Sequence, residues 1–187
     1  MGLKASEILD VIKRSDRCYQ TVRGFVAERQ LEIRLDALVT TGGLEVVHRI
    51  NRDGQPDFRV SRGGRLQTIE CKNVKSNDSY KKTGERKVDF QRTRNQLGAE
   101  GRTGRYYKPD EFDILAAAEH TSGGEWGFKF VRVARLPQVV VDGITCCTKV
   151  VRVPVVLKGT PWSDDVLTVL DAAGPPPTSP PQLFTRP

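Results

Sequence analysis

Two acidic residues and a lysine are spaced so that a short hairpin would bring them together. Asp57 opens one apolar stretch, and Glu70 and Lys72 lie on the next, beyond the turn at Gly63-Gly64. Residues two apart on a strand point to the same face, so Glu70 and Lys72 share a face, and Cys71 points into the core. We therefore expect Asp57, Glu70 and Lys72 to converge at one edge of a sheet.

These residue types suit phosphodiester chemistry assisted by a divalent cation. Two carboxylates close together repel each other and have raised pKa values unless a cation lies between them. Mg²⁺ accepts one or two carboxylates together with water and phosphate oxygens, and it lowers the pKa of a bound water. The carbonyl of Cys71 would be a further ligand, and Lys72 would position the water and offset negative charge. The alternative is a surface salt bridge between Glu70 and Lys72.

A basic segment follows the hairpin directly. The chain has 30 Lys and Arg against 23 Asp and Glu, which gives a net charge of +7. Residues 72–108 hold eleven basic and four acidic residues, so this segment carries the whole excess. Such a segment favours a polyanionic partner, because phosphates attract cations and their binding releases counterions. The alternative is a solvated loop face.

The hydrophobic pattern changes from a helical period to strand alternation just before the hairpin. Residues 5–15 and 18–39 have helical spacing, and Gly42-Gly43 ends the second helix. Residues 88–97 fit either period, and we favour a helix there. The expected strands span residues 44–51, 57–61, 66–74, 112–119, 126–133, 139–141 and 145–153, and a last helix over 164–172 has Ser163 as its N-cap.

Pro56-Asp57 and Glu70-Cys71-Lys72 resemble the PD-(D/E)XK signature of restriction-endonuclease-like nucleases. The order of elements is similar too, with a helix, a three-strand meander, a further element and a buried strand, over about residues 18–133. The resemblance implies an α/β fold with a restriction endonuclease-like core, in which helices flank a central mixed β-sheet. It also implies that Asp57 and Glu70 are metal ligands and that Lys72 is the catalytic lysine.

Two further catalytic residues are suggested by the same resemblance. Many members carry an acidic residue on the helix before the meander, and Glu28 is the best match here, although a solvated helix face would also explain it. Some branches carry a glutamine on the element after the lysine, and Gln91 fits that role. Asn95 stands where the exonuclease branch has a tyrosine, which puts processive exonuclease activity in doubt.

The resemblance implies a Mg²⁺-dependent DNA endonuclease that leaves 5′-phosphate and 3′-hydroxyl ends, with Mn²⁺ able to substitute. One active site cuts one strand, so double-strand cleavage of duplex DNA would require a homodimer. The alternatives are a non-catalytic nucleic-acid-binding subunit and a structural subunit of a larger defence or repair complex. The residues expected to contact DNA are Lys75, Lys81, Lys82, Arg92, Arg94, Arg102 and Arg105.

The composition of the chain limits the classes of protein to which it can belong. Apolar residues make up 37% of the chain, which predicts a globular fold, and no apolar run is long enough for a membrane span. The four cysteines include no C-x-x-C pair, so we expect reduced thiols in a cytoplasmic protein rather than a zinc site. Residues 1–173 are predicted to form a single nuclease domain, and residues 174–187 a proline-rich, disordered tail.

Overall fold

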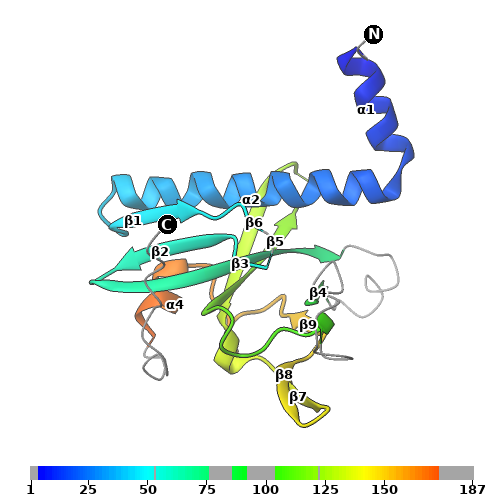
Figure 1. Cartoon of the computed structure of the whole chain (residues 1–187). Helices are drawn as coiled ribbons and strands as arrows, with labels where there is room; N and C mark the ends of the chain where they lie inside the picture. Colours follow the sequence, from blue (N-terminus) through cyan, green and yellow to red (C-terminus); the bar gives the residue numbers. More distant parts are fainter. Residues whose placement is uncertain (1–3, 53, 76–85, 92–103, 122, 173–187) are drawn as a thin grey trace, which may run out of the picture.

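The structure is a computed structural model that describes residues 4–52, 54–75, 86–91, 104–121 and 123–172 (Figure 1). It is a mixed α/β fold in which a long helix lies across one face of a β-sheet. The proline-rich segment at 174–187 lies outside the described residues. Within the described ranges, no helix is long and apolar enough to cross a membrane.

The two predicted N-terminal helices are confirmed as α1 (Ala5–Arg14) and α2 (Asp16–Thr40), with only Ser15 between them. The Ser15 hydroxyl accepts a hydrogen bond from the Cys18 N–H at 3.3 Å, which caps the start of α2. Helix α2 ends where Gly42 takes a left-handed conformation at φ 76°. Its residues Ala27, Leu31 and Leu35 are buried against the sheet.

The predicted meander is confirmed as three antiparallel strands, β1 (Val46–Arg49), β2 (Phe58–Arg62) and β3 (Arg65–Lys75). The buried apolar run forms β5 (Ile114–His120), which lies parallel to β3, and β6 (Trp126–Arg132) pairs antiparallel with β5. The sheet is therefore mixed, as expected, and β3 lies between β2 and the buried strand β5.

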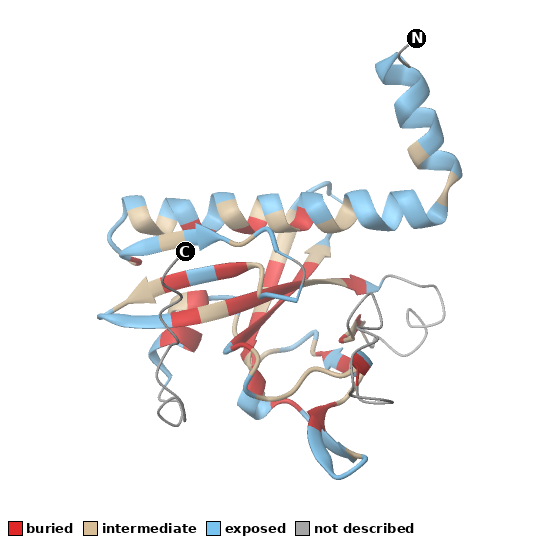
Figure 2. Ribbon diagram, viewed as in Figure 1, coloured by how far each residue is buried: buried red, intermediate tan, exposed pale blue. Residues whose placement is uncertain are grey.

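Two hydrophobic cores lie on opposite faces of β3 and β5. Figure 2 marks the buried residues along the ribbon in red. The first contains the buried stripe of α2 together with α4 (Val166–Asp171). The second packs against β4 (Arg86–Asp89) and β9 (Val150–Val153), and includes Trp162. Alternation along β3 divides its residues between these cores, because neighbouring side chains point to opposite faces.

Three expectations about local structure are wrong in detail. Residues 86–89 form strand β4 rather than the start of a helix over 88–97, because Val88 is fully buried in the second core and β4 pairs with β9. The strand expected over 145–153 is divided into β8 (Ile144–Cys147) and β9, of which only β8 pairs with β7 (Gln138–Val141). Asp165, rather than Ser163, caps α4 by accepting hydrogen bonds from the backbone of Leu167 and Thr168.

Candidate active site

The candidate site lies where one edge of β3 changes partner. Pairing between β2 and β3 ends at Phe58 and Ile69, and pairing between β3 and β4 begins at Val74 and Val88. Residues 70–73 of β3 lie between these two partners, while β5 covers their opposite edge. The change of partner leaves a short gap in the ladder, and the residue that precedes β2 can reach into it.

Asp57 occupies this gap. Its Oδ2 accepts a hydrogen bond of 2.7 Å from the backbone N–H of Cys71, which gives a partner to an amide that β2 does not reach. Cys71 itself is buried in the first core, so its thiol points away from the face that carries Glu70 and Lys72. The hydrogen bond places the Asp57 carboxylate beside the Glu70–Lys72 segment of β3.

Glu70 is held by two donors on the opposite face from Cys71. Only 5% of this residue is exposed, and its Oε1 accepts hydrogen bonds from the Lys72 ammonium and from the Tyr107 hydroxyl, the latter at 2.7 Å. The Lys72 ammonium also lies 5.7 Å from the centroid of the Tyr107 ring. The predicted convergence therefore includes an ion pair, but a partly buried one rather than one on an open hairpin surface.

Tyr107 is the site residue that sequence reasoning missed. The sequence patterns described above assign no role to it. The Tyr107 ring packs against Phe90 and Phe112, with ring centroids 4.9 and 5.1 Å away, while its hydroxyl reaches Glu70. No spacing in the sequence indicates this contact, because it joins residues 37 positions apart through tertiary packing.

The surroundings of the candidate site shift the pKa values of Asp57, Lys72 and Tyr107. Burial is the largest cause that raises the pKa of Asp57 to about 7, and the negative charge of Glu70 is the next, whereas Lys72 and the Cys71 N–H oppose this increase. Burial alone would lower the pKa of Lys72, but the nearby Glu70, Tyr107 and Asp57 outweigh burial and raise it above its usual value. Burial likewise raises the pKa of Tyr107, so its phenol stays protonated at neutral pH.

The donor set suits a small, hard cation. Among the described residues, neither Asp57 Oδ1 nor Glu70 Oε2 receives a hydrogen bond, so each carboxylate keeps one oxygen for a ligand. The same residues contain no group of three or more His, Cys, Asp and Glu side chains that could hold a metal ion. Two carboxylates are enough for Mg²⁺, which fills its remaining positions with water and phosphate oxygens. A cation would also relieve the repulsion that raises the pKa of Asp57.

The two auxiliary candidates are not hydrogen-bonded to this group. Glu28 forms an ion pair with Arg49 at 2.9 Å on the other side of the sheet, although its charge still contributes to raising the pKa of Asp57. Gln91 is half-buried just after β4, and no hydrogen bond between described residues joins it to Asp57 or Glu70. Both residues stay predictions as catalytic groups.

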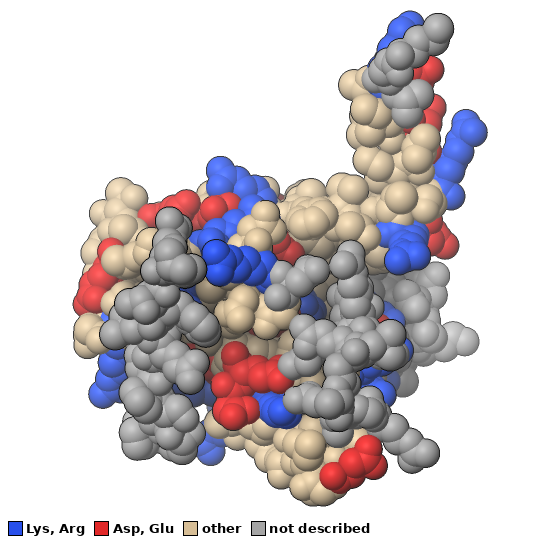
Figure 3. All heavy atoms as spheres, in the orientation of Figure 1, with Lys and Arg blue, Asp and Glu red and all other residues tan. Residues whose placement is uncertain are grey.

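Of the residues expected to contact DNA, the structure describes two. Both Lys75 and Arg105 are exposed, and Lys75 also forms an ion pair with Asp89. Basic and acidic side chains are interspersed on the face in Figure 3, so the described residues present no uniformly basic surface there. The other five lie outside the described residues: Lys81, Lys82, Arg92, Arg94 and Arg102.

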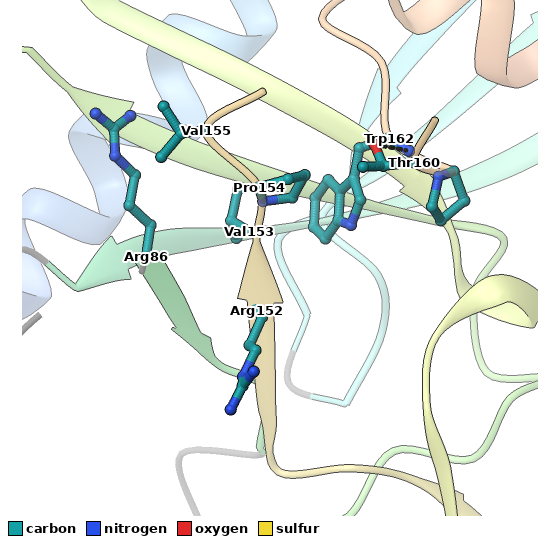
Figure 4. A pocket seen from close by; sticks show the side chains of 8 residues that line it. Arg86, Arg152, Val153, Pro154, Val155, Thr160 and Trp162 are labelled. Atoms are coloured by element: carbon teal, nitrogen blue, oxygen red, sulfur yellow. Dashed lines mark hydrogen bonds between the residues drawn. The ribbon is translucent and has the colours of Figure 1, made fainter. Parts of the chain in front are cut away.

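A separate pocket of about 480 Å³ lies beside β9, lined mainly by apolar side chains that include Val153, Pro154 and Trp162 (Figure 4). Arg86 and Arg152 also line it, and the Arg86 guanidinium forms an ion pair with Glu119. None of the candidate catalytic residues lines this pocket, so the pocket and the candidate site are different places.

Comparisons with known proteins add little at the level of sequence. No protein-family profile matches the chain, and no curated protein matches it. Among solved structures, the chain is similar to a bacterial homing endonuclease, I-Ssp6803I, with 19% sequence identity and a TM-score of 0.38. The match covers 61% of this chain and 65% of that one, so the chain spans less than two thirds of the length of the structure it matches.

Proposed function

We propose that the protein is a metal-dependent DNA endonuclease of the PD-(D/E)XK type, with Asp57, Glu70 and Lys72 as its active site. The observation that supports this most is the hydrogen bond from the Cys71 N–H to Asp57, because it places an acid from before β2 beside two residues of β3. A protein that only binds DNA has no need for a desolvated acid with a pKa of about 7 next to a buried glutamate.

Asp57 and Glu70 would hold Mg²⁺ through the oxygens that receive no hydrogen bond, with Mn²⁺ able to substitute. The Cys71 carbonyl would be a further ligand, because the N–H and C=O of one strand residue face the same edge, and its N–H already meets Asp57 there. When bound, the metal would supply Lewis-acid stabilisation of the phosphoryl charge and lower the pKa of a coordinated water.

Lys72 would be the catalytic residue that contacts the attacking water and the phosphate. Its pKa lies above the usual value, so the ammonium is charged at every physiological pH, and 23% of the side chain remains exposed to an arriving phosphate. In the reaction, water oxygen bonds to phosphorus as the bond from phosphorus to the 3′ oxygen breaks, and a proton reaches that oxygen. Lys72 would orient the water and offset the developing charge, leaving 5′-phosphate and 3′-hydroxyl ends.

Tyr107 would be a positioning residue. Its hydroxyl bonds Glu70 Oε1 while its ring is fixed between Phe90 and Phe112, so Glu70 has one rotamer and presents Oε2 to a ligand. The substrate class follows from charge, because the basic excess of residues 72–108 begins at the active-site lysine itself.

The test is plasmid cleavage by the purified full chain with Mg²⁺, and again with EDTA in excess. We expect supercoiled DNA to be nicked or linearised only with the metal, and Lys72→Ala to abolish cleavage while DNA binding persists. Lys158→Ala is the matched control, because Lys158 is exposed and distant in sequence from β3. DNA binding without cleavage of any DNA or RNA substrate would instead assign the chain to the non-catalytic alternative.

A further inference from the structure

The N-terminal arm, defined as residues 5–26, exposes an unusual amount of apolar surface. Helix α1 has no buried residue and extends away from the sheet (Figures 1 and 2). The large apolar side chains that the arm leaves between about a third and a little over half exposed are Ile8, Leu9, Val11, Tyr19, Val22, Phe25 and Val26. Contiguous apolar surface of this kind on a soluble chain marks an interaction site.

The exposed residues follow helical spacing. In α2 the buried stripe is Ala27, Leu31 and Leu35, whereas Tyr19, Val22 and Val26 lie three and four apart on another side of the helix. Helix α2 therefore has two apolar faces, of which the sheet covers only one. No described residue of the chain covers the second face enough to bury it.

The exposed apolar residues of α1 and α2 lie at equal sequence distances on either side of Ser15. Ile8 and Val22 are each seven residues from Ser15, and Val11 and Tyr19 are each four residues from it. If α1 lay antiparallel to the first half of an α2 helix, Ile8 would meet Val22 and Val11 would meet Tyr19.

Helix α1 cannot make this contact within its own chain. Ser15 is the only residue between α1 and α2, whereas two antiparallel helices need a connection of about two to five residues. The α2 helix of a second copy would offer α1 the same complementary stripe without this constraint.

We propose that the protein forms a symmetric dimer in which the arms of two copies exchange, with α1 of each copy antiparallel to residues 16–26 of the other. This register places the two Ser15 residues opposite each other on the two-fold axis, as an isologous interface requires. It also places Glu7 opposite Arg23 and Arg14 opposite Asp16, which are two pairs of opposite charge, while Lys13 lies opposite Arg17.

The size of the arm suits this role. A standard protein–protein interface takes roughly 20–30 residues from each side, which is the length of the arm. The surface is more apolar than a weak transient contact needs, and Leu9 and Phe25 extend the apolar stripe at its margins.

The first experiment measures mass against concentration by analytical ultracentrifugation, with no DNA or metal present. We expect a dimer, and we expect Ile8→Glu and Val22→Glu each to weaken association by about tenfold or more, because each would bury an unpaired charge. Val156→Glu is the control, since Val156 is equally apolar and 69% exposed but lies outside the arm. All substituted positions are exposed, so circular dichroism should show unchanged folding.

The second experiment tests the register. In a Cys18→Ser background, Ser15→Cys should form a disulfide between copies on mild oxidation, whereas Ser6→Cys should not, because Ser6 would face a different residue of the partner. Glu7→Arg should weaken the dimer, and Glu7→Arg with Arg23→Glu should restore it.

A chain that stays monomeric at the highest concentration tested, with no Ser15→Cys cross-link, would overturn the proposal. Dimerisation that survives both glutamate variants would overturn it as well, because the interface would then lie elsewhere. Neither result bears on the proposed nuclease, since the monomer carries a complete candidate site and would still nick one strand.

Discussion

Asp57 Oδ2 lies 2.7 Å from the backbone nitrogen of Cys71, across the gap that β2 and β4 leave on one edge of β3. This contact fixes an acid that directly precedes β2 beside a glutamate and a lysine of β3. It also takes the acid out of water, which raises its pKa. The arrangement is therefore costly for the metal-free protein and useful to a protein that binds a cation there.

Stability without metal should depend on the ionisation of Asp57. Its pKa is raised from 3.8 to about 7, so its stabilising contribution is complete below the unfolded pKa and is lost as pH rises through 7. Asp57→Asn keeps an acceptor for the Cys71 N–H but removes the charge. In EDTA at pH 8 the variant should be more stable by on the order of 2 kcal/mol, because one pKa unit corresponds to about 1.4 kcal/mol and relaxation reduces the full value.

Urea denaturation at pH 5 and pH 8 measures this difference. The advantage of Asp57→Asn should shrink towards pH 5, where wild-type Asp57 is already protonated in the folded state. Equal stability of the two proteins at both pH values would contradict the assigned burial of Asp57.

Removing the Tyr107 hydroxyl should loosen Glu70 without disturbing the core. Tyr107→Phe keeps the ring contacts with Phe90 and Phe112 but loses the hydrogen bond to Glu70, at a cost of about 1 kcal/mol in unfolding free energy. We expect the Mg²⁺ concentration for half-maximal cleavage to rise, with a smaller change in maximal rate. Tyr106→Phe is the control, because the contact recorded for Tyr106 is between its ring and Lys149. If cleavage by Tyr107→Phe depends on Mg²⁺ concentration as it does in the wild type, the positioning role of Tyr107 is contradicted.

Arg105 and Lys75 should differ in their effect on DNA affinity. Arg105 is exposed, so Arg105→Ala should reduce the slope of log affinity against log salt by about 1 for one lost phosphate contact. Lys75 must leave Asp89 before it can meet a phosphate, so Lys75→Ala should change the slope less. Filter binding across a salt series measures both slopes, and identical slopes in wild type and Arg105→Ala would place Arg105 outside the DNA contact.

Removing the N-cap of α4 should change the stability of the protein. The Asp165 carboxylate accepts hydrogen bonds from the Leu167 and Thr168 amides, so Asp165→Ala should cost about 1 kcal/mol and Asp165→Asn much less. The Thr168 hydroxyl and these amides lower the pKa of Asp165. Its contribution is therefore present above the unfolded pKa of 3.8 and is lost as pH falls through the lower folded value. Thermal unfolding at pH 7 and pH 3 would show this, and a loss from Asp165→Ala that is equal at both pH values would exclude the charge as its cause.

The sequence predicts the parts of the fold that depend on local spacing. Alternation placed Glu70 and Lys72 on one face and Cys71 in the opposite core, and the Gly63-Gly64 turn correctly joined β2 and β3. The parallel pairing of β3 with β5 could not be read from spacing, because it joins segments about 45 residues apart. Sequence spacing also does not reveal that one edge of β3 pairs first with β2 and then with β4. Asp57 occupies the gap between these two partners.

Local sequence patterns do not predict secondary structure or contacts correctly where tertiary packing determines them. Val88 and Phe90 fit either a helix or a strand, and only burial against the second core and pairing with β9 select the strand. Tyr107 reaches Glu70 because its ring packs between two phenylalanines from other elements. Glu28 illustrates the opposite case, since its position in the helix was read correctly but its nearest partner is Arg49.

The most direct test of the account is a crystal structure of the full chain grown with Mn²⁺, whose anomalous scattering locates the ion. The account predicts one ion bound by Asp57 and Glu70, with the Lys72 ammonium beside it and with the site lost in Asp57→Asn. An active protein whose Mn²⁺ binds elsewhere, or whose Asp57 and Glu70 carry no ion at saturating Mn²⁺, would contradict it.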